Sequence, residues 1–141
     1  MSKVLVPVDG SDCSLRALQQ AVQWAKSAPG TEVVVLNVQA PIVSGHARMF
    51  LSKSDIQTYH ELEGKEVLDK VKPVLEASGV PHSSTMRVGH LAETIVEYGR
   101  EQKCDSIMMG TRGLGEVAGL LLGSVTRKVI HLAEVPITLV K

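Results

Sequence analysis

Two continuous apolar runs near the amino terminus most constrain what this chain can fold into. The first covers Val4 to Val8 and the second Val33 to Val38, and both are rich in β-branched residues. Runs without polar alternation are typical of strands buried on both faces. Between them, apolar residues recur at spacings of three and four, which predicts an amphipathic helix that Ser11 or Asp12 caps and Pro29-Gly30 ends. A strand, a helix and a strand within about 35 residues indicate a parallel crossover unit.

The same alternation continues along the rest of the chain. The sequence predicts a long helix that Ser54 caps and Gly79 ends, a weaker strand over Ser83 to Val88, a helix from Leu91 to about Gln102, a strand over Ser106 to Met109, a short helix over Val125 to Leu132 and a closing strand over Pro136 to Val140 that lies at a sheet edge. The irregular segment from Gln39 to Ser52 is predicted to be a loop, and its role stays open. Because no repeat, low-complexity tract or linker is present, residues 1–141 are predicted to form one doubly wound α/β domain.

Length and charge exclude several classes of protein. A chain of 141 residues is long enough to bury roughly 70% of its unfolded surface in one core. Its 15 basic and 15 acidic side chains cancel, so no net field attracts nucleic acid or an anionic membrane. No segment approaches the roughly 20 apolar residues of a membrane-spanning helix, and the amino terminus lacks the apolar region of a signal peptide. Since Cys13 and Cys104 are isolated in the sequence, we expect a cytoplasmic protein.

Glycine is concentrated in one segment, Gly110 to Thr126, which joins a predicted strand to a predicted helix. Glycine lets a backbone approach a ligand closely and adopt positive φ, and a helix amino terminus offers free amides and a partial positive charge. The segment therefore has the features of an anion site. Its spacing differs from that of the P-loop, which needs a lysine directly before Ser124, and from the dinucleotide fingerprint. A flexible loop that uses glycine for its turns is the alternative.

Asp9 directly follows the first predicted strand, and ligands of open parallel sheets bind at the carboxyl ends of strands. Its carboxylate is predicted either to cap the turn or to accept hydrogen bonds from ribose hydroxyls, or to bind phosphates through a cation such as Mg²⁺. Arg112 and Lys128 are candidate positive charges, with solvated surface side chains as the alternative. Met109 is either a core residue or part of an adenine pocket. No catalytic set stands out, because the five histidines lack metal-ligand spacing and neither cysteine has an adjacent partner.

Three short segments of the chain carry a family resemblance. They are Val-Pro-Val-Asp9-Gly-Ser, then Gly110-x-x-Gly113 followed after nine residues by Gly123-Ser124-Val-Thr, and finally Val-Pro-Ile-Thr-Leu-Val. Together they resemble the universal stress protein family, and the glycines are similar to the signature of its nucleotide-binding branch. The resemblance implies a five-stranded parallel sheet in the order 3-2-1-4-5 with helices on both faces, an adenine nucleotide alpha hydrolase-like arrangement, and a crevice for ATP or AMP.

The resemblance also implies a role for each matching position. The residues along the base and sugar would be Pro7, Val8, Asp9 and Val38; those bordering the ribose and phosphates would be Met109, Gly110, Arg112 and Gly113; those holding the phosphates through amides and hydroxyls would be Gly123, Ser124, Val125 and Thr126. The strand from Val135 to Val140 would pair with a second copy to form a homodimer. Asn37 and His90 depart from the family pattern, where a histidine and a helix-capping residue are frequent.

The first hypothesis for function is a stress-response sensor or regulator that binds ATP or AMP and passes its state to an unidentified protein partner. An enzyme is less expected, because no general base or phosphate-binding lysine accompanies the glycines. A slow ATPase in which Asp9 holds Mg²⁺ is one alternative, and a pure protein-interaction module is another. Neither nucleic acid nor a membrane is an expected partner. The preference for ATP or AMP, and dimer against higher oligomer, stay open.

Overall fold

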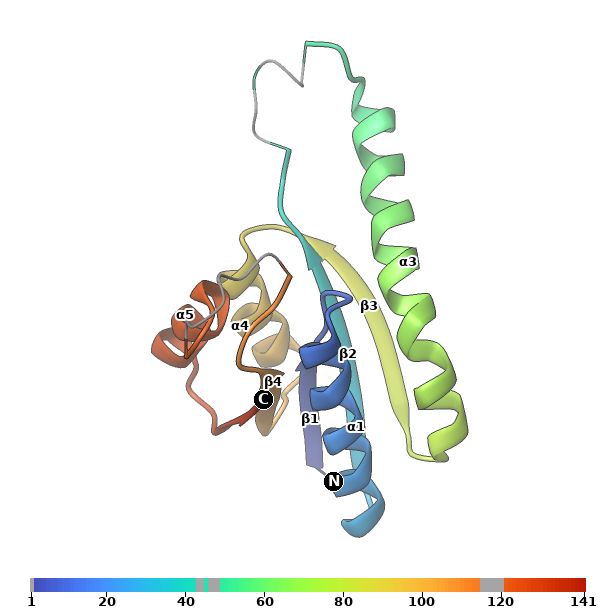
Figure 1. Ribbon diagram of the computed structural model, residues 1–141, viewed down its shortest axis with the longest axis vertical. Coiled ribbons are helices and arrows are strands. Elements are labelled where there is room, and N and C mark those ends of the chain that lie inside the picture. The colour runs from blue at the N-terminus through green and yellow to red at the C-terminus, as the bar shows by residue number, and fades with distance from the viewer. Residues whose placement is uncertain (1, 43–44, 46–48, 115–120) are drawn as a thin grey trace.

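The computed structural model describes residues 2–42, 45, 49–114 and 121–141. In this part of the chain, strands and helices alternate in the order β1 (Ser2–Pro7), α1 (Asp12–Ser27), β2 (Thr31–Gln39), α3 (Lys53–Ser78), β3 (His82–Val88), α4 (Leu91–Glu101), β4 (Ser106–Gly110), α5 (Ser124–Leu132) and β5 (Ile137–Val140). All pairings between strands are parallel, and the strand order is β3-β2-β1-β4-β5. The predicted five-stranded sheet is confirmed (Figure 1).

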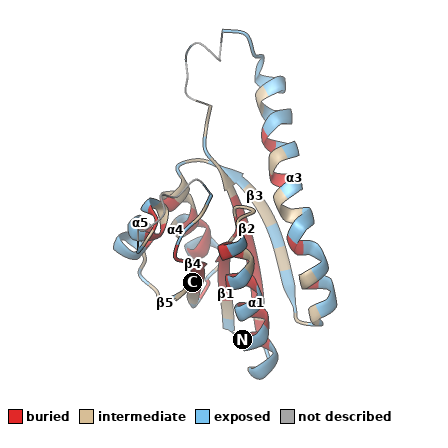
Figure 2. Ribbon diagram, viewed as in Figure 1, coloured by how far each residue is buried: buried red, intermediate tan, exposed pale blue. Residues whose placement is uncertain are grey.

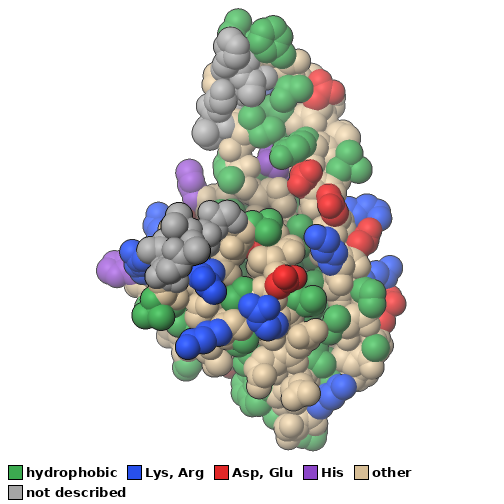
Figure 3. Space-filling view, viewed as in Figure 1, with side chains coloured by type: hydrophobic (Ala, Val, Ile, Leu, Met, Phe, Trp, Pro, Cys, Tyr) green, Lys and Arg blue, Asp and Glu red, His purple; other side chains and the backbone are tan. Residues whose placement is uncertain are grey.

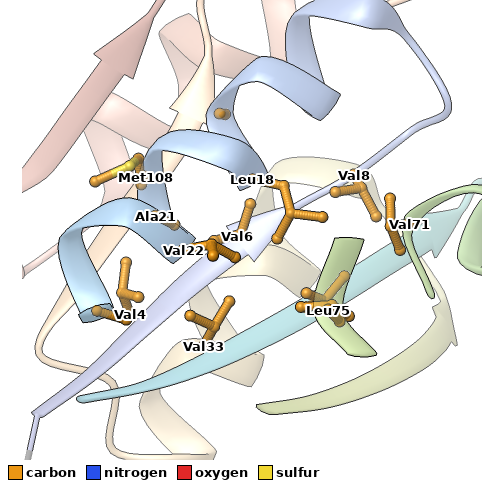
Figure 4. Packing of buried hydrophobic residues seen from close by; sticks show 13 residues of the cluster. Val4, Val6, Val8, Leu18, Ala21, Val22, Val33, Val71, Leu75 and Met108 are labelled. Atoms are coloured by element: carbon orange, nitrogen blue, oxygen red, sulfur yellow. The ribbon is translucent and has the colours of Figure 1, made fainter. Parts of the chain in front are cut away.

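Helices cover both faces of this sheet, as a doubly wound fold requires. On one face, Val4 and Val6 of β1 pack with Leu18 of α1 and Leu75 of α3 (Figure 4). On the other face, Leu5 packs in a second cluster that includes residues of α4 and α5. Successive residues of a strand point to opposite faces, so the valine-rich run of β1 serves two cores at once. Figure 2 shows this burial concentrated in the central strands and in the helix faces turned toward them.

Side-chain caps define where two of the helices begin. Ser11 is the cap of α1, because its hydroxyl accepts a hydrogen bond from the Ser14 amide at 3.2 Å. The expectation that Ser54 caps the long helix is wrong: the cap of α3 is Ser52, two residues earlier. Ser52 and Asp55 form a reciprocal capping box, which a cap at Ser54 would forgo. Gly79 ends α3 with a φ of 72°, as expected of a glycine that stops a helix.

The long helix α3 extends past the sheet at its amino-terminal end (Figure 1). The predicted loop from Gln39 to Ser52 leads into it; β2 runs through Gln39, and residues 43–44 and 46–48 lie outside the described part of the chain. Hydrophobic side chains gather at this end of the molecule (Figure 3), among them Phe50, Tyr59 and Leu62, which are exposed. The buried residues of α3 are His60, Gly64, Val71 and Leu75, so the helix packs on the rest of the protein from its middle to its carboxyl-terminal end. Among the described helices, none has the length and apolar character needed to cross a bilayer.

Candidate functional site

A cavity of about 240 Å³ opens at the carboxyl ends of the central strands. β1 pairs with β2 from Ser2 to Pro7 but with β4 only at Val4 and Leu5. Since β1 and β4 are not paired beyond these residues, their carboxyl ends leave room for a crevice between them. The chain also reverses its direction of strand addition here, from β2 and β3 on one side of β1 to β4 and β5 on the other. This is the switch point where open α/β sheets bind their ligands.

The cavity brings together most of the residues predicted from the sequence. It is lined by Pro7, Val8, Asp9, Ser14, Leu36, Val38, Leu91, Ile95, Met109, Gly110, Arg112, Gly113, Leu114, Val125 and Thr126. Of the predicted site residues, Gly123 and Ser124 are not part of this lining. The predicted glycine segment from Gly110 to Thr126 is described except for residues 115–120.

Five lining residues were missed at the level of sequence: Ser14, Leu36, Leu91, Ile95 and Leu114. Leu36 could have been predicted from the sequence, because it lies two positions before Val38 in the same strand and therefore on the same face of the sheet. Leu91 and Ile95 lie one turn apart at the start of α4, a spacing that reads as an ordinary core stripe. With Val38 and Met109 they make one wall of the cavity apolar, as is typical of small-molecule sites.

The carboxylate of Asp9 joins two segments that are far apart in sequence. Its Oδ1 accepts hydrogen bonds from the amide and the hydroxyl of Ser11, the amide at 2.9 Å. Its Oδ2 accepts one from the Leu114 amide at 3.0 Å. Both oxygens are thus already used inside the protein, which favours the turn-capping interpretation and gives Asp9 a second task, anchoring the loop after β4. Among the described residues, no group of three or more His, Cys, Asp or Glu side chains is placed to hold a metal ion.

Two of the glycines predicted for the site are required by the close approach of other protein atoms. A Cβ on Gly113 would overlap Asp9 Oδ2, so glycine here lets the Asp9 carboxylate reach the loop. A Cβ on Gly110 would lie 2.8 Å from Cys13 Sγ and 3.1 Å from the Cys13 carbonyl carbon. Gly110 therefore lets the first turn of α1 pack against the end of β4. In this structure both glycines make room for protein groups beside the cavity.

The start of α5 forms the polar side of the site. The Gly123 amide donates to the Thr111 carbonyl at 2.7 Å, and the Thr126 hydroxyl donates to the Gly110 carbonyl at 3.0 Å. These two groups hold the helix start against the end of β4, so the Thr126 hydroxyl proton is engaged inside the protein. The amides of the first helical turn have no acceptor within the helix, and they carry the partial positive charge of its amino terminus.

The candidate positive charges differ in their surroundings. Lys128 forms an ion pair with Glu93, which links α5 to α4, and the hydrogen bond from Lys128 holds the pKa of Glu93 below its ordinary value. Arg112 lines the cavity and its side chain is exposed at the rim. Of the two candidate positive charges, Arg112 lines this cavity and Lys128 does not.

Asn37, which departs from the family pattern, lies behind the cavity wall. It is 1% exposed, its Nδ2 donates to the Val8 carbonyl at 2.8 Å, and its Oδ1 accepts from Gln39 Nε2 at 2.7 Å. The Val8 amide in turn donates to the Leu36 carbonyl. The side chain of Asn37 thus adds one more hydrogen bond between β2 and the residue that follows β1. This bond lies beside Val8 and Asp9, which line the cavity.

Comparison with known proteins places this chain among relatives of similar length. The model of the universal stress protein family matches residues 1–141. The universal stress protein MJ0531 of Methanocaldococcus jannaschii is 38% identical over 141 residues, which cover 99% of this chain and 81% of the relative. Sequence and family model agree over the whole length.

Solved structures show the same fold. The structure of the protein MJ0577 matches with a TM-score of 0.86 and 28% identity over 99% of this chain and 95% of its own. A universal stress protein in complex with cAMP matches with a TM-score of 0.73 at 26% identity, covering 99% and 97% of the two chains. The universal stress protein of Archaeoglobus fulgidus in complex with dAMP matches with a TM-score of 0.72 at 26% identity, covering 100% and 98%.

Proposed function

The chain belongs to the universal stress protein family, and on this basis we propose that it binds an adenine nucleotide, ATP or AMP, in the crevice at the carboxyl ends of its strands. The observation that carries the proposal is the crevice itself. One of its walls is apolar, Val125 and Thr126 of the first turn of α5 line it, and Arg112 stands at its rim. An apolar wall suits a base, and a helix amino terminus suits a phosphate.

Two structural relatives support an adenine nucleotide as the ligand. They were solved in complex with cAMP and with dAMP. Both ligands combine adenine, a sugar and one phosphate group, which matches the two chemical halves of this cavity. The position-by-position roles of Pro7, Val8, Asp9 and Val38 toward base and sugar, and of the residues from Met109 to Thr126 toward the phosphates, belong to the same proposal.

The proposed role is that of a nucleotide-dependent regulator or sensor in a stress response. A ligand shifts a conformation only as far as it prefers one state over another, so the site needs a connection to a surface. β5 offers one: the Thr111 amide donates to the Val140 carbonyl at 2.9 Å, and Cys13 Sγ donates to the same carbonyl at 3.3 Å. Groups directly beneath the cavity thus hold the end of the closing strand.

That closing strand is the proposed homodimer contact. β5 pairs with β4 on one side, and within the described part of the chain no strand pairs with its other side. An unpaired edge is a template for a second copy. We expect Thr138→Lys, a charge at an exposed position of this edge, to give a monomer in sedimentation analysis. A wild-type protein that sediments as a monomer would contradict the dimer.

A thermal melt of the purified chain tests nucleotide binding. Ligand present at a hundred times its Kd adds about 2.7 kcal/mol to the free energy of unfolding, or several degrees in Tm for a domain of this size. We expect ATP or AMP to raise Tm and GTP to raise it less. Val38→Trp should remove the shift by filling the cavity, whereas Val88→Trp, at an exposed position at the end of the neighbouring strand, should keep it.

The outcomes separate the functional hypotheses. An equal Tm with and without each nucleotide would contradict nucleotide binding and favour a pure protein-interaction module. A shift together with ATP that stays intact for hours supports a sensor. Steady phosphate release that disappears in Asp9→Ala would instead favour the slow Mg²⁺-dependent ATPase.

A further inference from the structure

A second cavity, of about 220 Å³, lies at the amino end of β4. It is enclosed by the last turn of α4, the start of β4 and the segment that joins α5 to β5. Its lining residues are Val96, Gly99, Arg100, Lys103, Cys104, Ile107, Ala133, Glu134 and Val135. None of them lines the proposed nucleotide site, so this cavity is a separate feature of the same strand.

The floor of the second cavity is apolar and uncharged. Val96, Ile107 and Val135 supply aliphatic surface, and all three belong to or pack against the core cluster on this face of the sheet. Cys104 completes the floor and is 7% exposed. Burial raises the pKa of the Cys104 thiol to about 11, so the thiol is protonated at neutral pH. A ligand group placed on this floor must therefore be apolar.

The rim, in contrast, carries two cations and one anion. Arg100 and Glu134 form an ion pair at 3.3 Å across the rim, with side chains 61% and 78% exposed. Exposed pairs of this kind contribute little to stability, so Glu134 can leave Arg100 at small cost. Lys103 forms no ion pair among the described residues.

The backbone keeps Lys103 at this rim in spite of an unfavourable conformation. Its φ is 56°, in the left-handed region where glycine is the usual residue at a helix end. The Lys103 amide donates to the Arg100 carbonyl at 3.1 Å and the Cys104 amide to the Gly99 carbonyl at 2.8 Å. These hydrogen bonds close α4 and hold the lysine beside Arg100. The partial negative charge of the helix end, about half a unit, is smaller than the two full positive charges.

An apolar floor beneath a rim that offers two cationic side chains, Arg100 and Lys103, suits one class of ligand. We propose that this cavity binds a small organic monoanion, a carboxylate with an aromatic or aliphatic body, whose body contacts Val96, Ile107 and Val135. The carboxylate replaces Glu134 as the partner of Arg100 and also accepts from Lys103. This site does not depend on nucleotide binding at the other end of β4.

Amide-resolved NMR titration of the ¹⁵N-labelled full chain tests this proposal, with 4-methylbenzoate as the probe. We expect saturable shifts at the amides of Gly99, Lys103, Cys104 and Val135, with a Kd on the order of 1 mM for so small a ligand. The neutral isostere 4-methylbenzamide should bind at least about fivefold more weakly, since the charge-assisted hydrogen bonds are lost. Shifts that do not saturate, equal binding of the two probes, or shifts confined to the nucleotide cavity would each overturn the proposal.

Substitutions at the rim and one inside the cavity test the proposed contacts separately. Arg100→Gln should weaken 4-methylbenzoate binding roughly fivefold, and Glu134→Gln should strengthen it about twofold by removing the competing carboxylate. Arg127→Gln, an exposed arginine on α5 outside the lining, is the matched control and should leave Kd unchanged. Ala133→Leu should abolish binding by filling the cavity, provided that its Tm shows a folded protein. Weaker binding of 4-methylbenzoate in Glu134→Gln would overturn the proposal, because removal of a competing carboxylate should only strengthen the binding of an anion at Arg100.

Discussion

The two ends of β4 carry cavities of similar volume, about 240 Å³ at the carboxyl end and about 220 Å³ at the amino end. Their polar groups have different origins. At the carboxyl end the groups are mostly backbone: the start of α5, and glycines that let Asp9 and Cys13 come close. At the amino end they are the long side chains of Arg100, Lys103 and Glu134. A backbone-built site should therefore fail when glycines are replaced, whereas a side-chain-built site should be tuned by surface substitutions.

The largest expected loss of stability is that of Gly110→Val, at the carboxyl end of β4. The new side chain would meet the Cys13 carbonyl carbon and Sγ, and backbone cannot move aside as a flexible side chain can. We expect a loss of about 3 kcal/mol in the free energy of unfolding, measured by urea denaturation. Cys13→Ala alone should cost less, and Cys13→Ala in the Gly110→Val background should restore only part of the loss. Unchanged stability in Gly110→Val would refute the close packing of α1 on β4.

Asn37→Leu should have the next largest effect, because it leaves the buried Val8 carbonyl without the amide that now donates to it. We expect about 2 kcal/mol of destabilisation and weaker nucleotide binding, both measured by thermal melts with and without ATP. Gln39→Ala removes only the hydrogen bond to Asn37 Oδ1 and is the control, with a smaller effect on both. Equal losses in the two variants would argue against a positioning role for Asn37.

Gly113→Ala is expected to act through Asp9. Its Cβ would displace the Asp9 carboxylate and with it the hydrogen bond to the Leu114 amide, so nucleotide affinity should fall about tenfold, by calorimetric titration. The test is a double-mutant cycle with Asp9→Ala. If the two residues act together, Gly113→Ala should cost much less affinity in the Asp9→Ala background. Strictly additive losses would mean that the glycine makes room for the ligand itself.

The smallest expected effect is a difference in thiol reactivity between Cys13, near the carboxyl end of β4, and Cys104, near its amino end. They are similarly buried, with Cys13 8% and Cys104 7% exposed. Burial raises the pKa of Cys13, but hydrogen bonds from the Arg112 and Thr111 backbones and the Thr111 hydroxyl lower it more, so its pKa lies below the ordinary value. That of Cys104 is raised to about 11. Since only the thiolate reacts, iodoacetamide at pH 8 should modify Cys13 at least about tenfold faster.

The pH dependence of the iodoacetamide reaction tests the directions of the two pKa shifts. Below its pKa, the thiolate fraction rises about tenfold per pH unit, so Cys104 labelling should keep rising up to about pH 11, whereas Cys13 labelling should level off earlier. Mass spectrometry of each cysteine measures both rates. Faster labelling of Cys104 at pH 8 would contradict the assignment of these environments.

Much of the fold was predictable because its signals are local. The apolar runs of β1 and β2, the Ser11 cap and the Gly79 stop each depend on a few neighbouring residues. The cap of α3 was misplaced by two residues, since Ser52 and Ser54 are both good caps and only the match of Asp55 to Ser52 distinguishes them. The strand order came from the family resemblance.

By itself, the sequence determined the alternation of strands and helices and the concentration of glycine after β4, because periodicity and turn chemistry are properties of short segments. Only the tertiary structure decided how those segments are used. It placed Leu91 and Ile95 in a cavity wall, made Gly113 and Gly110 the neighbours of Asp9 and Cys13, and created a second cavity beside Arg100. These contacts join residues up to about a hundred positions apart, and no local pattern specifies which distant side chain fills the space that a glycine leaves.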